Sequence, residues 1–144
     1  MGTWLAVTGT PHSLTAFLTP LLLSLAVLFW LAGFDTIYCL QDYDFDRSHG
    51  LHSIPVRFGV VWGLRFSSLF HLLTVFFLGL VGLSAGLGVI YWAGVAVACG
   101  ILIWEHRLVR PDDLSRINRA FFDLNAYVSV GYFLMTLADL LWQA

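Results

Sequence analysis

Long apolar stretches separated by two short charged segments dominate the sequence. Residues 14–34 carry no formal charge, and residues 66–104 again contain no Asp, Glu, Lys or Arg. A transmembrane helix needs about 20 predominantly apolar residues. The second stretch is therefore long enough for two such helices, and the small residues at 83–88 favour a tight turn between them. The pattern predicts four transmembrane helices, at about residues 14–34, 62–83, 88–105 and 120–142.

The composition indicates an integral membrane protein. Hydrophobic residues make up 59% of the 144-residue chain and charged residues 11%, whereas soluble domains carry about 25% charged residues. This composition excludes a soluble enzyme, a disordered chain and a nucleic-acid binder with a basic surface. Backbone groups in lipid must be satisfied internally, and the apolar stretches lack the alternating polarity of a membrane β-barrel. The expected fold class is therefore all-α, a polytopic bundle of about four helices in the lipid bilayer.

The charged residues predict how the bundle is oriented. All seven basic residues are Arg, and they lie within or beside two segments, residues 35–57 and 106–119. Cytoplasmic loops of membrane proteins carry an excess of Lys and Arg, so both segments are predicted to be cytoplasmic loops. The first residues of the chain have no basic segment ahead of their apolar ones, and we expect no secretory signal there.

The segment after the first predicted helix carries the candidate chemistry. If that helix continues at about 100° per residue, Asp35, Asp42 and Asp46 share one face and Asp44 points away. Like charges on one helical stripe repel each other, and a divalent cation would offset this repulsion. Mg²⁺ commonly binds through one or two carboxylates together with substrate phosphates. The stripe predicts a Mg²⁺–diphosphate site at the cytoplasmic mouth of the bundle. A solvated acidic loop is the alternative, above all for Asp44.

Two segments resemble a known family. The sequence GFDTIYCLQDYDFD at residues 33–46, continuing into GLHSIPVRFG at 50–59, resembles the second aspartate-rich motif of the UbiA-type intramembrane prenyltransferases. The sequence EHRLVRPDDLSRIN at residues 105–118, with Ala120-Phe121-Phe122 after it, is similar to the same subfamily. That subfamily comprises the 4-hydroxybenzoate polyprenyltransferases and their relatives in menaquinone synthesis.

The resemblance implies a Mg²⁺-dependent transferase of quinone biosynthesis, for ubiquinone or menaquinone. A polyprenyl diphosphate would be the donor, and an aromatic acid such as 4-hydroxybenzoate would be the acceptor. The protein would lie in the bacterial inner membrane with its acidic motif on the cytoplasmic side.

Matched residue by residue, the resemblance also implies roles for five side chains. Asp42 and Asp46 correspond to the metal-binding acids, and Asp35 to the acid that opens the motif, so the three are the expected catalytic residues. Tyr38 is expected to line the substrate site. Arg57 could contact a phosphate oxygen, as Arg often does, or could anchor the chain at the membrane surface.

The sequence also departs from the family pattern. Family members have about nine spans and a first acidic motif that has no counterpart here, so the chain resembles the C-terminal half of such an enzyme. We expect it to be inactive without the N-terminal half. The alternative is a non-catalytic membrane protein, either a remnant or a subunit that needs a separate N-terminal half.

Four polar residues outside the acidic segment have simpler interpretations. Asp112 and Asp113 are predicted to start a helix after Pro111, and His71 is expected to form a hydrogen bond between helices. Asp139, near the end of the last span, is expected to reach water. Acids within spans also raise the hypothesis of a small transporter.

Overall fold

Four long helices account for most of the molecule. The computed structural model describes residues 14–144, without the side chains of residues 14–16 and 119–121; the prediction about a secretory signal therefore lies outside the described residues. The long helices are α2 (Leu14–Tyr38), α5 (Val60–Ala85), α6 (Val89–Leu108) and α8 (Asn125–Gln143). Four helical stretches are long and apolar enough to cross a membrane: Phe17–Tyr38, Val60–Ala85, Val89–Leu108 and Phe122–Gln143. Since the described residues contain no strand, the prediction of an all-α transmembrane bundle is confirmed.

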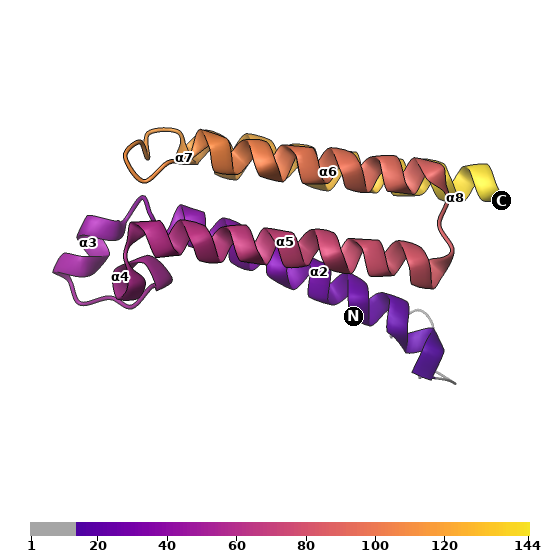
Figure 1. Ribbon diagram of the computed structural model, residues 1–144, viewed down its shortest axis with the longest axis horizontal. Helices are drawn as coiled ribbons and strands as arrows, with labels where there is room; N and C mark the ends of the chain where they lie inside the picture. Colours follow the sequence, from indigo (N-terminus) through magenta and orange to yellow (C-terminus); the bar gives the residue numbers. More distant parts are fainter. Residues whose placement is uncertain (1–13) are drawn as a thin grey trace.

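The helices form two packed pairs that run alternately in opposite directions. Helix α2 packs chiefly on α5, and α6 chiefly on α8, with a smaller contact between α5 and α6. Figure 1 shows the consequence: the short helices α3 (Tyr43–Ser48), α4 (Ile54–Phe58) and α7 (Ile117–Arg119) gather at one end of the bundle. The α5–α6 turn and the C-terminus lie at the other end.

A hydrogen bond and a hydrophobic cluster join the segments at the end that carries α3, α4 and α7. Gln41 Nε2 donates to Asn118 Oδ1 at 2.8 Å, so the chain just after α2 is tied directly to α7. At the same end, buried apolar residues from α2, α5, α6 and α7 and from the segments just after α2 and α6 form a cluster; its members include Ile37, Leu40, Leu64, Leu108, Val109 and Ile117. The two charged segments are therefore one structural unit, although they are far apart in the sequence.

The predicted turn at residues 83–88 is present, and a distant carboxylate completes it. Gly86 ends α5 with φ 63°, a left-handed conformation that glycine adopts without steric cost. Asp139 of α8 then accepts hydrogen bonds from the backbone N–H groups of Gly88 at 2.7 Å, Ile90 at 3.1 Å and Tyr91 at 3.2 Å. These are first-turn donors of α6 that have no acceptor within their own helix. The expectation that Asp139 reaches water is wrong, because its side chain is 1% exposed and caps α6.

The long helices extend beyond their predicted ends at the charged side. The first runs on past residue 34 to Tyr38, and the third past 105 to Leu108. Both extensions are held by the buried cluster, which the hydropathy of a single segment does not reveal.

The helix predicted to start after Pro111 is absent. Arg110 and Asp113 exchange backbone hydrogen bonds of 3.2 and 3.1 Å across a tight turn. The Asp113 carboxylate accepts from the backbone N–H and the hydroxyl of Ser115 at 3.1 and 2.6 Å. These hydrogen bonds lower the pKa of Asp113 below its ordinary value. Because Asp113 stabilises a turn, helix formation is delayed until Ile117.

Candidate functional site

The predicted acidic stripe is interrupted by a turn. Asp35 lies in the last turn of α2, which ends at Tyr38, and Asp42 is the residue just before α3. Between them the backbone tightens: Leu40 N–H donates to the Ile37 carbonyl at 3.0 Å, closing a turn of three residues rather than four. The premise of one continuous helix through Asp46 is therefore wrong. Leu40 is buried in the cluster described above, and this burial holds the turn in place.

The turn nevertheless leaves the three carboxylates within electrostatic range of one thiol. Burial raises the pKa of the Cys39 thiol, and the negative charges of Asp35, Asp46 and Asp42 raise it further, in that order. All three acids therefore lie at the same end of the bundle as this thiol. Asp35 and Asp42 are exposed and Asp46 is half-buried, so their oxygens are accessible from the end of the bundle. Asp44 is exposed in the first turn of α3 and is not among the charges that act on Cys39.

The acidic group is open rather than compact. A compact metal site needs three or more ligand atoms close together. Among the described residues, one group of His, Cys, Asp or Glu side chains has its ligand atoms within 4.8 Å of one another, and it does not include these acids. The carboxylates of Asp35, Asp42 and Asp46 do not by themselves enclose a cation. Their hard oxygen atoms fit Mg²⁺, which takes one or two carboxylates and completes its shell with water and phosphate.

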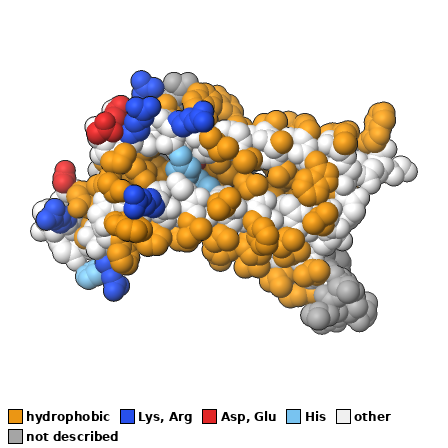
Figure 2. Space-filling view, in the orientation of Figure 1, with side chains coloured by type: hydrophobic (Ala, Val, Ile, Leu, Met, Phe, Trp, Pro, Cys, Tyr) orange, Lys and Arg blue, Asp and Glu red, His pale blue; other side chains and the backbone are white. Residues whose placement is uncertain are grey.

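Tyr38 and Arg57 lie at the same end of the bundle as the acids. Tyr38 is the last residue of α2, with 37% of its surface exposed. Arg57 lies in the last turn of α4, whose N-cap residue is Ser53, and its guanidinium lies 5.4 Å from the centroid of the Phe58 ring. Figure 2 shows Arg and acidic side chains gathered at this end, while hydrophobic side chains cover the rest of the visible face. A basic group and the acidic group thus share one end of the molecule.

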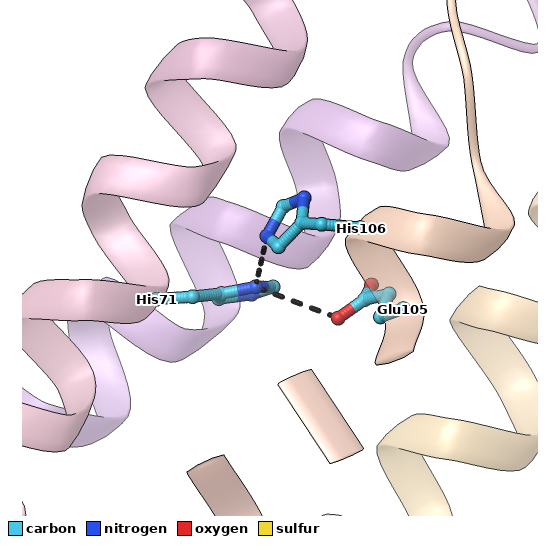
Figure 3. Close-up of side chains that lie close together, drawn as sticks. All are labelled: His71, Glu105 and His106. Atoms are coloured by element: carbon cyan, nitrogen blue, oxygen red, sulfur yellow. Dashed lines mark hydrogen bonds and ion pairs between the residues drawn. The ribbon is translucent and has the colours of Figure 1, made fainter. Parts of the chain in front are cut away.

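A second polar group lies inside the bundle. His71 of α5 faces Glu105 and His106 of α6: its Nδ1 lies 3.0 Å from His106 Nε2 and 3.4 Å from Glu105 Oε2 (Figure 3). His71 is 3% exposed and Glu105 is fully buried. The predicted interhelical hydrogen bond of His71 is therefore confirmed. We refer to His71, Glu105 and His106 as the His–Glu–His cluster.

A cavity of about 460 Å³ adjoins this cluster. Apolar side chains of α5 and α6 line most of it, and its polar wall is formed by Ser68, His71, His106 and Arg107. Figure 2 shows pale blue histidine atoms within a hollow of the visible face, and the histidines that line the cavity are His71 and His106. The cavity gives two members of the cluster access from outside.

Sequence reasoning missed the roles of Glu105 and His106. The sequence pattern places Glu105 at the very end of the third predicted span and His106 at the start of a cytoplasmic loop, and neither position predicts a buried polar contact. A usable signal was present in the sequence: the apolar pair Leu108-Val109 follows them, which indicates that the chain stays buried past the charges, and both residues are buried in the structure. Their partner is 35 positions away, and no local pattern connects them to it.

The fold and the charged end define an α-helical, polytopic membrane protein with an acidic site at one end of its bundle. Residues 1–130 match the UbiA prenyltransferase family, and the chain belongs to that family. No solved structure shows significant similarity to it.

Several curated relatives are 4-hydroxybenzoate octaprenyltransferases. The one from Xanthomonas euvesicatoria pv. vesicatoria (strain 85-10) is 37% identical over 112 residues, which are 78% of this chain and 36% of the relative. The one from Pseudomonas aeruginosa (strain UCBPP-PA14) is 34% identical over 118 residues, 82% of this chain and 39% of the relative. The one from Sodalis glossinidius is 34% identical over 108 residues, 72% of this chain and 36% of the relative. The chain thus spans somewhat more than a third of the length of these relatives.

Proposed function

We propose that this chain supplies the acidic half of the active site of a Mg²⁺-dependent prenyltransferase. The reaction transfers a polyprenyl group from its diphosphate to an aromatic acid such as 4-hydroxybenzoate, in ubiquinone or menaquinone biosynthesis. The observation that carries the proposal is the position of three accessible acids at the charged end of the bundle: Asp35 in the last turn of α2, Asp42 just before α3 and Asp46 in its first turn. Membership of the family and the names of the relatives support the reaction and the acceptor class.

The carboxylates of this chain would hold the diphosphate end of the donor. Asp42 and Asp46 are the proposed Mg²⁺ ligands, and Asp35 lies one turn deeper, at the end of a membrane-spanning helix. When bound, Mg²⁺ supplies Lewis-acid stabilisation of the leaving diphosphate. The bond between the prenyl carbon and the phosphate oxygen breaks, the same carbon bonds to the aromatic ring, and the ring loses a proton.

Arg57 and Tyr38 have positioning roles in this proposal. Arg57 is exposed at the end of α4, where its guanidinium can donate to a phosphate oxygen. Tyr38 is the last residue of α2 and lies in the chain between Asp35 and Asp42, where it would contact the donor near the junction of its diphosphate head and its apolar tail. The apolar helices would accommodate the prenyl chain, and they exclude water from the reacting carbon.

We also propose that the charged end faces the cytoplasm of a bacterium and that the chain resides in the inner membrane. The support is the Arg distribution: every basic residue lies in or beside the two charged segments. Because the relatives are about twice as long and the chain matches little more than a third of them, we propose that further membrane-spanning segments complete the active site and that the chain is inactive without them.

The proposed activity is tested in membranes that lack an endogenous 4-hydroxybenzoate prenyltransferase. The chain is expressed alone and together with the part of the Pseudomonas aeruginosa relative that it does not match, and prenyl transfer to 4-hydroxybenzoate is measured with Mg²⁺ or EDTA. We expect transfer only with both parts and only with Mg²⁺. Asp42→Asn and Asp46→Asn should each lower the rate about a hundredfold, because a stabiliser of transition-state charge is weakened.

The matched control is Asp44→Asn, because Asp44 is an exposed acid in α3, the short helix that also contains Asp46. Its rate should equal that of the unmodified chain. Transfer by the chain alone would contradict the need for a second part while supporting the activity. No transfer in either setting would favour a non-catalytic membrane protein. Equal rates for the Asp42, Asp44 and Asp46 variants would contradict the assigned ligands.

A further inference from the structure

The His–Glu–His cluster has more polar atoms than it can pair. Among the described residues, neither oxygen of Glu105 has a hydrogen-bond partner. A buried carboxylate without a partner is strongly unfavourable in an apolar interior. Unpaired buried groups therefore call for an explanation, and an unseen ion is one of the few available.

Ser68 fixes which nitrogen of His106 carries the proton. The Ser68 hydroxyl donates its one proton to the Leu64 carbonyl at 2.9 Å. The hydroxyl oxygen, 3.2 Å from His106 Nδ1, must therefore accept from that nitrogen. A neutral His106 then has a lone pair on Nε2, and this lone pair points at His71. An imidazole whose other nitrogen donates to a fixed acceptor is the usual state of a histidine that binds a metal.

The three facing atoms cannot all be satisfied by one proton. If His71 Nδ1 carries a proton, it can donate to His106 Nε2 at 3.0 Å, and this leaves the Glu105 carboxylate unpaired. If Nδ1 carries a lone pair, it faces the lone pair of His106. A cation between the three atoms accepts all of their lone pairs and also neutralises the carboxylate.

The spacing of the atoms agrees with a shared cation. Tetrahedral zinc sites have Zn–N distances of about 2.0–2.1 Å, so neighbouring ligand atoms lie about 3.3 Å apart. The separations here are 3.0 and 3.4 Å, and all three side chains offer ligand atoms within 4.8 Å of one another. The two members with access to the cavity are histidines, which gives an ion a way in.

We propose that His71, Glu105 and His106 bind one divalent transition-metal ion of the Zn²⁺ type, which fastens the α2/α5 helix pair to the α6/α8 pair. Two imidazoles and one carboxylate suit first-row transition metals, whereas Mg²⁺ prefers all-oxygen sites. The cluster bridges α5 and α6, whose direct packing is weaker than the packing within either pair. This site is separate in place and chemistry from the acidic group around Cys39.

The experiment measures metal binding by the purified 144-residue chain in detergent, prepared without a polyhistidine tag and stripped of metal. Zn²⁺ content is determined after gel filtration, Co²⁺ is used as a spectroscopic probe, and thermal unfolding is followed with and without Zn²⁺. We expect one Zn²⁺ per chain, a tetrahedral Co²⁺ absorption spectrum and a higher melting temperature with Zn²⁺. Excess Mg²⁺ should not displace the ion.

Variants test the individual ligands. His106→Gln and Glu105→Gln should each weaken Zn²⁺ binding at least tenfold and abolish the Zn²⁺-dependent rise in melting temperature. The matched control is His52→Gln, an exposed histidine in the segment before α4, which should bind Zn²⁺ as the unmodified chain does. The unmodified chain alone gives a decisive result even if a variant fails to fold. Failure to retain Zn²⁺, a Co²⁺ spectrum of an octahedral ion, or equal binding by the cluster variants would overturn the proposal.

Discussion

The pKa of the Cys39 thiol depends on the charge of the acidic group formed by Asp35, Asp42 and Asp46. Its pKa is raised first by burial and then by Asp35, Asp46 and Asp42. A thiol reacts as its thiolate, so Cys39 should be alkylated slowly at neutral pH. Cancelling the carboxylate charges removes the electrostatic part of the shift and leaves the part due to burial.

Mg²⁺ should therefore move the reactivity profile of Cys39 to lower pH. The measurement is the midpoint of the pH–rate profile for maleimide alkylation in a Cys99→Ser chain, with and without Mg²⁺. The midpoint should fall with Mg²⁺ but remain above the ordinary thiol pKa. In the Asp42→Asn/Asp46→Asn variant the midpoint should be lower than in the Cys99→Ser chain without Mg²⁺, should stay above the ordinary thiol pKa because burial and Asp35 still raise it, and should not respond to Mg²⁺. If Mg²⁺ left the midpoint of the Cys99→Ser chain unchanged or raised it, binding of Mg²⁺ at these carboxylates would be contradicted.

At the level of single residues, the sequence identifies candidate acids but does not predict which side chains are buried or what they contact. The acids of the 35–46 segment could be identified from their spacing, although the turn that brings them together depends on the burial of Leu40. Glu105 could not be recognised, because its burial depends on a histidine in another helix. The burial of Asp139 was equally hidden, since its partners are backbone N–H groups that carry no side-chain signal.

Close packing between α6 and α8 depends on a glycine at the contact. A Cβ atom added at Gly94 would lie 2.7 Å from Cβ of Met135, an atom that cannot move without its backbone. Small residues at helix interfaces let membrane helices approach this closely. The contact therefore sets the distance between the two helices.

Gly94→Ala should lower the free energy of unfolding by about 1–3 kcal/mol, the range for overpacking a close contact. The matched control is Gly100→Ala in the same helix, where an added Cβ meets nothing within 4 Å. That change should be neutral or stabilise by about 1 kcal/mol, because alanine favours the helical backbone. Thermal unfolding in detergent compares the two. Equal stabilities would show that α6 and α8 do not pack closely at this position.

Helices were predicted more reliably than their ends. The number of spans and the turn at residues 83–88 follow from hydropathy and small residues, because lipid imposes a fixed length on apolar helices. Helix ends depend on tertiary contacts instead: α2 and α6 continue until the buried cluster at the charged end is complete. Asp113 shows the reverse case, in which a local turn with Ser115 replaces a predicted helix start.

For the whole molecule, the antiparallel order of the helices places both charged segments on one side of the membrane (Figure 1). In a chain without Cys39 and Cys99, we introduce single cysteines by Ser48→Cys, Ser115→Cys and Ser84→Cys, all at exposed positions. In intact bacteria a membrane-impermeant maleimide should label only the Ser84→Cys chain. The other two should react after permeabilisation.

The pattern of labelling tests the order of the helices and the orientation of the bundle separately. Reaction of Ser48→Cys and Ser115→Cys from opposite sides would contradict the order of the helices. Reaction of both from outside would leave the fold intact and contradict the cytoplasmic orientation that the Arg residues predict.

The capping of α6 by Asp139 implies an order of events during biosynthesis. The first N–H groups of α6 receive their acceptor from a residue 51 positions further along the chain than Gly88. A helix terminus without acceptors is unfavourable at the edge of the bilayer. Helices α2 and α5 can pair as soon as both have been translated and inserted, whereas α6 cannot complete its terminus until α8 has left the ribosome and entered the membrane beside it.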